Sequence, residues 1–205
     1  MISLSTTLFS SCLNRQKSIV IINNKKYKIK KLIGEGAFSY VYLIDDDIGQ
    51  EYALKLIRCQ SSNDLKLIKN EINITLKFSN DFIIDVIDYE IIDDELIYIL
   101  FPYYNKGSLQ DKMSEGYKYD ERELWELFKC ICVAVQDVHN SKYVHRDIKP
   151  ANFLLDDTEK PILIDFGSVI ASPTFIENRS IALYHQDLAS IHSTMPYRGM
   201  YFNSR

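Results

Sequence analysis

The segment from His145 to Asn152 combines, at a short fixed spacing, the residue types that phosphoryl transfer requires. It reads His-Arg-Asp-Ile-Lys-Pro-Ala-Asn, and an Asp-Phe-Gly triplet begins downstream at Asp165. The carboxylate of Asp147 can take the proton of a substrate hydroxyl. The amide oxygen of Asn152 and the carboxylate of Asp165 can hold a divalent cation against phosphates. The spacing therefore predicts Asp147 as a general base, with Asn152 and Asp165 as metal ligands.

The residues around this base also have simpler interpretations. An Asp that follows an Arg is most often part of a surface ion pair. Lys149 and Asn152, at fixed distances behind Asp147, favour the catalytic interpretation. Lys149 would then stabilise charge on the transferring phosphoryl group. His145 is expected to pack beneath the metal-binding residues and not to ligate the metal.

A glycine-rich segment and a strand lysine lie upstream in the same chain. Residues 34–41 read Gly-Glu-Gly-Ala-Phe-Ser-Tyr-Val and lie between strand-like runs over 27–33 and 39–44. The loop thus joins two antiparallel strands, whereas a Rossmann or Walker loop opens a helix. Its glycines would let the backbone approach nucleotide phosphates. Lys55, in the next predicted strand over 51–57, would neutralise those phosphates.

These motifs occur in the order that they have in protein kinases, and the chain resembles that superfamily. The resemblance implies an α+β, bilobal fold with a five-stranded antiparallel small lobe and a mainly helical large lobe. It implies ATP and Mg²⁺ as cofactors. It also implies a protein substrate with Ser or Thr hydroxyls, because Lys149 follows the base as in serine/threonine kinases. Such kinases hold the strand lysine with a helix carboxylate, so Glu71 is expected to pair with Lys55.

The nucleotide is expected to contact the glycine-rich loop, the strands that follow it and a hinge between the lobes. The hinge is placed at residues 101–107, because Pro102 cannot donate to a sheet and Gly107 permits a turn. The expected nucleotide-binding residues are Ile33, Gly34, Glu35, Gly36, Ala37, Phe38, Ser39, Val41, Ala53, Lys55, Phe101, Pro102, Tyr103 and Tyr104.

Apolar periodicity predicts the remaining elements. Strands are expected over 85–92, 96–103, 153–155 and 162–164, and helices over 64–78, 109–114 and 121–140. The expected buried stripe of the 64–78 helix is Leu65, Ile68, Ile72 and Leu76. The expected buried side of the longest helix is Leu124, Leu127, Phe128, Ile131, Val135 and Val138, with Trp125 packed beside it.

Some segments resemble the Numb-associated kinase group in particular. They are the Phe38-Ser39 loop, Ser168 after the Asp-Phe-Gly triplet, and Ala-Leu-Tyr-His-Gln-Asp at 182–187. The nearest branch is its myristoylated and palmitoylated serine/threonine kinase with yeast vacuolar relatives. Those proteins begin Met-Gly, whereas this chain begins Met1-Ile2, which cannot be myristoylated. Cys12 alone would be a weak acyl anchor, so a cytoplasmic location is expected, with peripheral endomembrane association as the alternative.

The C-terminal part departs from the kinase pattern. Gly199-Met200-Tyr201 stands where kinases have Ala-Pro-Glu, and Thr194 matches the threonine that contacts the catalytic Asp and Lys in kinases. The sequence therefore predicts a mobile tail over 1–17, a small lobe and hinge over 18–104, and a truncated large lobe over 105–205 that ends in the activation segment. The alternative to catalysis is a truncated, non-catalytic nucleotide-binding or partner-docking module.

Composition excludes some other classes of protein. The 205 residues are 46% hydrophobic, enough for a sizeable core, and the net charge of −4 does not favour nucleic-acid binding. No apolar stretch approaches the roughly 20 residues that cross a bilayer. Cys12, Cys59, Cys130 and Cys132 have no metal-ligand or disulfide spacing, so a reducing compartment is expected. Cys130 and Cys132 are expected to fill the core.

Overall fold

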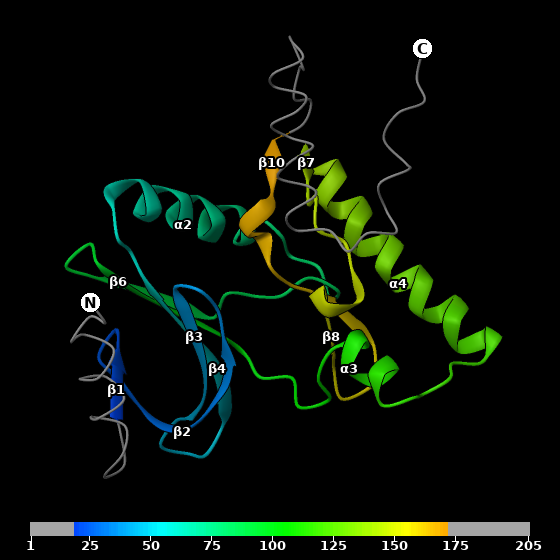
Figure 1. Cartoon of the computed structure of the whole chain (residues 1–205), viewed down its shortest axis with the longest axis horizontal. Helices are drawn as coiled ribbons and strands as arrows, with labels where there is room; N and C mark the ends of the chain where they lie inside the picture. Colours follow the sequence, from blue (N-terminus) through cyan, green and yellow to red (C-terminus); the bar gives the residue numbers. More distant parts are fainter. Residues whose placement is uncertain (1–18, 172–205) are drawn as a thin grey trace. The chain divides into compact units, whose positions relative to one another are not determined.

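The computed structural model describes residues 19–171, which fall into two compact units along the chain (Figure 1). Among these residues, the first unit contains 19–69 and Asp85–Tyr103, and the second contains Asn70–Ile84 and 104–171. The expectations for the tail over 1–17, for Cys12, and for Thr194 and Tyr201 lie outside the described residues. The proposed lobe limits stay predictions.

The first unit is built on one antiparallel sheet with the strand order β1-β2-β3-β4-β6-β5. The strands are β1 (Ile19–Ile22), β2 (Lys25–Glu35), β3 (Ser39–Asp45), β4 (Glu51–Arg58), β5 (Asp88–Ile92) and β6 (Leu96–Pro102). The α+β class and antiparallel sheet are confirmed, but the expected five strands are six. β1 is the addition, because Ile19–Ile22 alternates between exposed and buried residues and pairs with β2.

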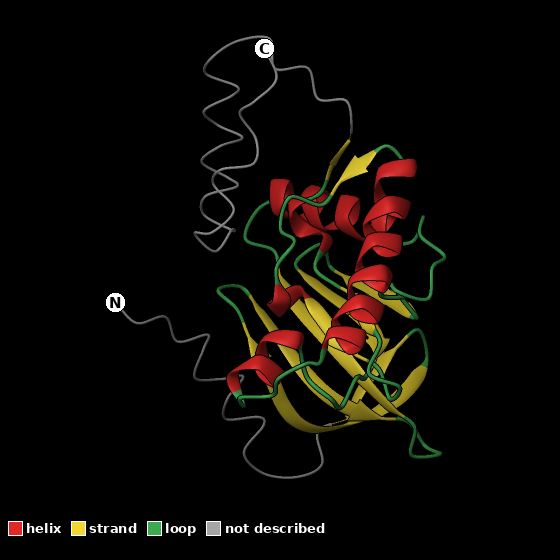
Figure 2. Ribbon diagram, turned by 90° about the vertical axis from the view of Figure 1, so that its right-hand side faces the viewer, coloured by secondary structure: helices red, strands yellow, loops and turns green. Residues whose placement is uncertain are grey.

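A tight turn joins β1 to β2 and also reaches the opposite edge of the sheet. Asn23 and Asn24 have φ of 47° and 67°, as a two-residue hairpin of the type I′ class requires. The Asn23 side chain donates to Asp88 Oδ1 at 2.7 Å and to the carbonyl of Tyr89 at 3.1 Å, both on β5. The strands drawn yellow in Figure 2 accordingly curve, and the strongly curved sheet encloses an apolar cluster. Its members are Val20, Ile22, Tyr27, Tyr42, Ile44, Leu54, Leu56 and Leu100.

Helix α2 (Ser62–Thr75) spans the division between the two units. It begins at Ser62, two residues before the expected start, because Ser61 caps it: Asp64 N donates to Ser61 Oγ at 3.2 Å, and Gln60 N donates to Asp64 Oδ2 at 2.9 Å. Leu65 and Ile72 are buried as expected. The expected stripe was wrong for Leu76, which is 48% exposed because the helix ends one residue earlier.

The second unit holds the two remaining helices and four short strands. Helices α3 (Leu109–Ser114) and α4 (Glu121–Asn140) have the expected bounds, and each begins with a reciprocal capping box, from Ser108 to Asp111 and from Asp120 to Glu123. The strands are β7 (Tyr143–Val144), β8 (Phe153–Leu155), β9 (Pro161–Leu163) and β10 (Ile170–Ala171), and the two 3₁₀ turns are η1 (Pro150–Asn152) and η2 (Phe166–Ser168).

The buried side of α4 differs from the expected one. Ala134 and Val138 are fully buried. Leu124, Phe128 and Trp125, expected to pack, are 50%, 56% and 57% exposed, and the expected core residue Cys132 is also exposed. The reason is that α4 packs against β7 and β9 through its C-terminal half, so its first turns lie beyond those strands.

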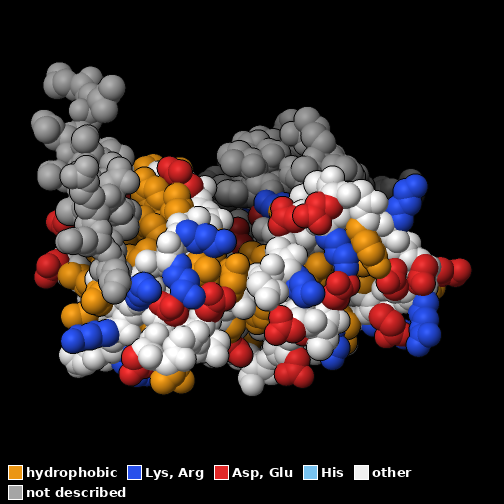
Figure 3. All heavy atoms as spheres, turned by 90° about the horizontal axis from the view of Figure 1, so that it is seen from below, with side chains coloured by type: hydrophobic (Ala, Val, Ile, Leu, Met, Phe, Trp, Pro, Cys, Tyr) orange, Lys and Arg blue, Asp and Glu red, His pale blue; other side chains and the backbone are white. Residues whose placement is uncertain are grey.

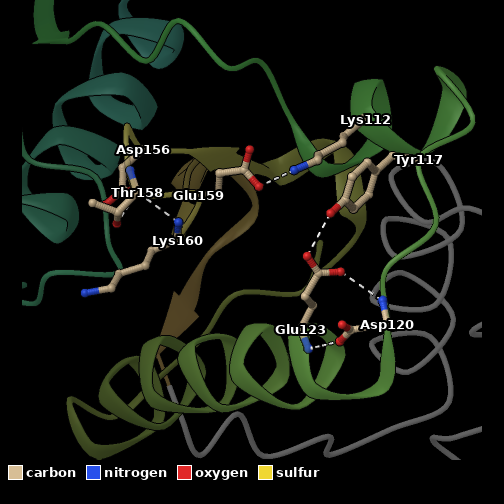
Figure 4. A network of polar contacts seen from close by, with 8 residues as sticks. All are labelled: Lys112, Tyr117, Asp120, Glu123, Asp156, Thr158, Glu159 and Lys160. Atoms are coloured by element: carbon tan, nitrogen blue, oxygen red, sulfur yellow. Dashed lines mark hydrogen bonds and ion pairs between the residues drawn. The ribbon is translucent and has the colours of Figure 1, made fainter.

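Polar contacts tie the α3–α4 connection to the β8–β9 turn (Figure 4). Lys112 of α3 pairs with Glu159 of that turn, and its Nζ lies 4.1 Å from the ring centroid of Tyr117. Tyr117 Oη donates to Glu123 Oε1 at 2.7 Å, and Glu123 Oε2 caps the first turn of α4. On the face that Figure 3 draws, acidic and basic side chains are interspersed.

Candidate active site

The predicted base Asp147 lies in the loop between β7 and β8 and is only 3% exposed. Its Oδ2 accepts hydrogen bonds from Lys149 Nζ at 2.7 Å and from Asn152 Nδ2 at 2.9 Å. Asn152 Nδ2 also donates to the backbone carbonyl of Asp147 at 2.8 Å. The structure therefore brings Asp147, Lys149 and Asn152 together, as the spacing predicted.

Local backbone structure explains why a residue five positions away reaches the base. Lys149 is extended, with φ of −154°, and Pro150 then starts the single 3₁₀ turn that ends at Asn152. Proline suits this first position, because its fixed φ is compatible with the turn and it has no N–H to leave unbonded. The Asn152 N–H donates to the carbonyl of Lys149 at 2.9 Å, which folds the chain back toward Asp147.

The other carboxylate oxygen of the base is different. Asp147 Oδ1 is buried and accepts no hydrogen bond from any residue in the described range 19–171. A buried polar atom without a partner is costly, so Oδ1 calls for a donor that the described residues do not supply. Asp147 thus has one oxygen fixed by two donors and one that is able to accept a donor from outside the described chain.

His145 connects this loop to the segment that precedes the Asp-Phe-Gly triplet. The side chain is 1% exposed, and Nε2 donates to the carbonyl of Ile164 at 3.1 Å. Burial lowers the pKa of His145, although the hydrogen bond to Ile164 opposes this shift. The ring packs edge-on against Phe166, with centroids 5.0 Å apart, in agreement with the packing role expected from the sequence.

Asp165, the second expected metal ligand, follows directly after Ile164. Ile164 N donates to the carbonyl of Asn152 at 2.9 Å, so the chain enters Asp165 directly beside the loop that carries Asp147. Asp165 has a left-handed backbone with φ of 65°, a conformation that Asp adopts more readily than most non-glycine residues, and Oδ1 accepts from Gly167 N at 3.4 Å. A Cβ built on Gly167 would lie 3.4 Å from Glu71 Oε2, so Glu71 of α2 also lies at this turn.

The side-chain oxygens of Asn152 and Asp165 suit a hard divalent cation that takes its remaining ligands from water and phosphates. Amide and carboxylate oxygens are the ligands that Mg²⁺ prefers, usually one or two from protein with the rest from water and phosphates. Within residues 19–171 no group of three or more His, Cys, Asp or Glu could hold a metal by itself. Asn152 and Asp165 therefore fit a cation that arrives with a phosphate ligand.

In the first unit, several expected nucleotide-binding residues share one face of the sheet. Gly34 lies opposite Val41, Val41 lies opposite Lys55, and Ala53 lies opposite Phe101. Directly paired residues of antiparallel strands point to the same side, and residues two positions apart on a strand do so as well. The structure thus brings these five residues to the face that does not contribute to the apolar cluster.

The loop between β2 and β3 has its own hydrogen bonds. Gly36 N donates to the carbonyl of Ser39 at 2.8 Å, and a Cβ on Gly36 would lie 2.9 Å from Ser39 Oγ, so a side chain would be crowded here. Phe38 is 59% exposed at the loop, while its carbonyl accepts from Arg58 N at 3.1 Å. Ile33 and Glu35, which belong to β2, and Ala37, which lies in the loop, are exposed.

The structure corrects part of the expected hinge, whereas the expected ion pair stays a prediction. β6 continues through Phe101 and ends at Pro102, so these two residues belong to the sheet and the chain leaves it only at Tyr103. Proline is compatible with the last position of a strand. Tyr103 ends the first unit, and Tyr104 begins the second. Lys55 and Glu71 also lie in different units, so their pairing stays a prediction.

Two residues of the site were missed in the sequence. Arg146 has φ of 67°, and its Nε donates to the carbonyl of Ser168 at 2.6 Å, which links the catalytic loop to η2. Phe78 packs against Phe166 with ring centroids 5.1 Å apart. Arg146 could have been considered because it adjoins the base, whereas Phe78 carries no local signal of its partner.

Comparison with known proteins decides the family. The protein kinase domain family matches residues 27–185 of this chain. The chain belongs to the protein kinase family. The fission yeast Schizosaccharomyces pombe serine/threonine-protein kinase ppk13 is 32% identical, over 88% of this chain and 65% of that protein. Human serine/threonine-protein kinase 16 is 31% identical, over 89% of this chain and 62% of that protein.

A third similar protein is the serine/threonine-protein kinase ENV7 of Saccharomyces cerevisiae, 26% identical over 96% of this chain and 73% of that protein. The chain spans 65% and 62% of the lengths of the fission yeast and human relatives. Members of the kinase family use ATP, a divalent metal and a protein substrate. None of the helices in the part of the chain that the structure describes is long and apolar enough to cross a membrane.

Proposed function

We propose that this protein transfers the γ-phosphoryl group of Mg-ATP to Ser or Thr hydroxyls of protein substrates, with Asp147 as the base. The observation that carries the proposal is the state of the two oxygens of Asp147. Lys149 and Asn152 fix Oδ2, which sets the direction of Oδ1. Oδ1 is buried, and within residues 19–171 it accepts no hydrogen bond, so a substrate hydroxyl would supply its missing donor.

The neighbouring residues have roles that suit this reaction. Lys149 Nζ lies 2.7 Å from the base, so a hydroxyl bound to Asp147 would also lie beside a cation that stabilises charge on the phosphoryl group. Asn152 and Asp165 would hold Mg²⁺, which neutralises phosphate charge when it is bound. Lys55 and the loop from Gly34 to Val41 would bind the phosphates.

Nucleotide binding is the first test. Mg-ATP at about a hundredfold excess over Kd should stabilise the folded chain by about 2.7 kcal/mol, because a ligand that binds only the folded state shifts the unfolding equilibrium. Thermal unfolding with and without Mg-ATP measures this shift, and AMP with Mg²⁺ serves as the control for phosphate recognition. No shift at millimolar Mg-ATP would refute nucleotide binding by this chain.

The second test separates binding from chemistry. Asp147→Asn should remove nearly all Ser/Thr phosphorylation while Mg-ATP binding persists, because the amide cannot take the hydroxyl proton. Asp165→Asn should weaken Mg²⁺-dependent binding as well. Asp157→Asn makes the same charge change at an exposed turn and should leave both unchanged. Equal turnover of Asp147→Asn and the parent would mean that another residue is the base.

Placement in the Numb-associated group is a further part of the proposal. It is supported by the Phe38-Ser39 loop and by Ser168. Peripheral association with endomembranes is the location that this placement would imply, and a cytoplasmic location is the alternative. Fractionation of cells that express the chain with Cys12 intact or replaced by Ser would distinguish these two locations. Membrane association that is lost in the Cys12→Ser variant would indicate anchoring by acylation of Cys12.

A further inference from the structure

The hairpin of β1 and β2, drawn in blue in Figure 1, has a charge opposite to that of the chain as a whole. Residues 19–34 contain five lysines and no Asp or Glu, whereas the net charge of the chain is −4, so the remaining residues sum to −9. The lysines are Lys25, Lys26, Lys28, Lys30 and Lys31. A basic segment on an acidic chain attracts anions locally, and salt weakens that attraction.

One side of this hairpin combines two of the lysines with exposed apolar side chains. Ile19 of β1 lies opposite Lys28 of β2, and Ile21 lies opposite Lys26. Directly paired residues of antiparallel strands point to the same side, so these four residues form one surface, which we call the hairpin face. Ile19 is 62% and Ile21 53% exposed, and both lysines are exposed. Val20, between the isoleucines, is buried in the apolar cluster on the other side.

The acidic residues that adjoin the hairpin face are paired with a different lysine. Asp45 lies opposite Lys28 on the neighbouring strand β3. Its Oδ2 lies 3.2 Å from Lys30 Nζ, which also donates to Glu51 Oε1 at 2.9 Å. The hydrogen bonds to Glu51 and Asp45 raise the pKa of Lys30. Between residues 19 and 171, no carboxylate forms an ion pair with Lys26 or Lys28, so their charges stay available to an anionic partner.

We propose that the hairpin face binds the surface of an anionic lipid bilayer. Lysines near such a surface are attracted by the headgroups, and aliphatic side chains enter the boundary between headgroups and acyl chains. Single-stranded nucleic acids are bound by basic grooves with aromatic rings that stack on bases, and the hairpin face has no such ring. A bilayer is the anionic partner with an apolar layer directly beneath its charges, so it matches both kinds of side chain.

The hairpin face lies away from the nucleotide-binding residues of the same sheet. Gly34, six residues after Lys28 on β2, is about 20 Å further along the strand. A bilayer at the hairpin face would therefore not cover the glycine-rich loop. The inference goes beyond the proposed function, because it requires neither phosphoryl transfer nor acylation of Cys12. One acyl chain gives only marginal membrane binding, and a basic patch is the kind of second signal that makes it stable.

Vesicle binding by the purified full chain without acyl groups is the first test. The chain is sedimented with phosphatidylcholine vesicles that contain about one-third phosphatidylserine, and with vesicles of phosphatidylcholine alone. It should bind the anionic vesicles about tenfold more strongly or better, and about 0.5 M salt should remove most of this difference, because salt screens the attraction. Equal binding to both kinds of vesicle would overturn the inference, and this comparison needs no variant.

A double substitution tests the lysines. Lys26→Gln with Lys28→Gln should lower the partition coefficient for the anionic vesicles about 25-fold, because each lysine near the surface contributes about fivefold. Lys66→Gln with Lys118→Gln makes the same charge change at exposed positions outside the hairpin and should have little effect. A loss of equal size in the two double variants would show that net charge alone governs binding, and would refute a role of the hairpin face.

A second double substitution separates a bilayer from other anionic partners. Ile19→Thr with Ile21→Thr keeps the β-branched side chains that suit a strand, and thermal unfolding checks that the fold persists. It should lower the partition coefficient about tenfold or more, because less apolar area enters the bilayer. Unchanged vesicle binding would mean that the hairpin face recognises negative charge alone, as an acidic peptide or an RNA supplies it, and would contradict the inference.

A final comparison keeps the inference apart from catalysis and acylation. The unacylated Cys12→Ser chain should bind the anionic vesicles as the parent does, and loss of binding in this variant would count against the hairpin face. A parent chain that binds these vesicles through Ile19, Ile21, Lys26 and Lys28 but transfers no phosphate would refute the proposed function and support the inference.

Discussion

Asn152→Ala is expected to be among the most costly single substitutions in the second unit. Asn152 is 6% exposed, and its Nδ2 donates to Asp147 Oδ2 at 2.9 Å and to the carbonyl of Asp147 at 2.8 Å. A hydrogen bond to a charged group contributes about 1.5–3 kcal/mol and a neutral one about 0.5–1.5 kcal/mol, so the free energy of unfolding should fall by about 2–4.5 kcal/mol. Urea denaturation followed by circular dichroism measures the change.

Asn23→Gly is the matched control for this prediction. The side chain of Asn23 also donates to one carboxylate and one carbonyl, but at an exposed turn where water can replace both bonds. Its φ of 47° is one that glycine adopts freely. The control should therefore lose less than about 1 kcal/mol. A similar loss for Asn152→Ala would show that the bonds to Asp147 do not hold the loop.

Asn152→Asp tests the same geometry through pH. It would place a second carboxylate at the 2.9 Å contact with Asp147 Oδ2, where two negative charges cannot coexist without a shared proton. The folded variant would then bind a proton that the unfolded chain releases above about pH 4, so its stability should fall as the pH rises from there. Asn152→Ala should lack this dependence. A flat profile for Asn152→Asp would refute the short contact.

Three further predictions concern the residues around this loop. Because burial lowers the pKa of His145 from 6.5, the unfolded chain takes up the proton first, and the free energy of unfolding should decrease as the pH falls below 6.5; His145→Gln should weaken that dependence in urea titrations at several pH values. Gly167→Ala would place Cβ 3.3 and 3.4 Å from two carboxylate oxygens, so Mg²⁺-dependent nucleotide binding measured by calorimetry should weaken with little change in melting temperature. Lys112→Met should lower the free energy of unfolding by about 1–2 kcal/mol, because it removes an ion pair and a cation–π contact of a side chain that is 13% exposed. Lys129→Met is the control and should cost much less, because the Lys129 side chain is 63% exposed.

Helices α3 and α4 could be predicted from their local sequence. Apolar periodicity gave the bounds of α3 and α4 correctly, and the reciprocal caps of Ser108 with Asp111 and Asp120 with Glu123, which are local contacts, explain why these helices begin there. The 3₁₀ turn at Pro150 is local in the same sense. For this reason, the meeting of Asp147 with Lys149 and Asn152 could be predicted from spacing alone.

Features that depend on distant partners could not be predicted in this way. The segment Ile19–Ile22 has the alternation of a strand, but its neighbour β2 and the contact of Asn23 with β5 make it part of the sheet. The apolar stripe of α4 continues past the strands that cover it, so periodicity alone could not show that Leu124 and Phe128 remain exposed. Periodicity shows only that a helix face is suitable for burial, whereas its actual burial depends on whether another element covers it.

The separation of five residues between base and amide follows from the geometry of the loop. The side chain of Lys149 returns to Oδ2 of Asp147, and the turn begun by Pro150 brings Asn152 Nδ2 to the same oxygen. The backbone carbonyl of Asn152 then accepts from Ile164 N, and the carbonyl of Ile164 accepts from His145 Nε2, two residues before the base. These bonds form a closed path through the base, the amide and the residue before Asp165. Because each bond of the path constrains the next, the whole path sets the direction of Asp147 Oδ1. A substitution that removes any of these bonds should therefore change the direction of Oδ1.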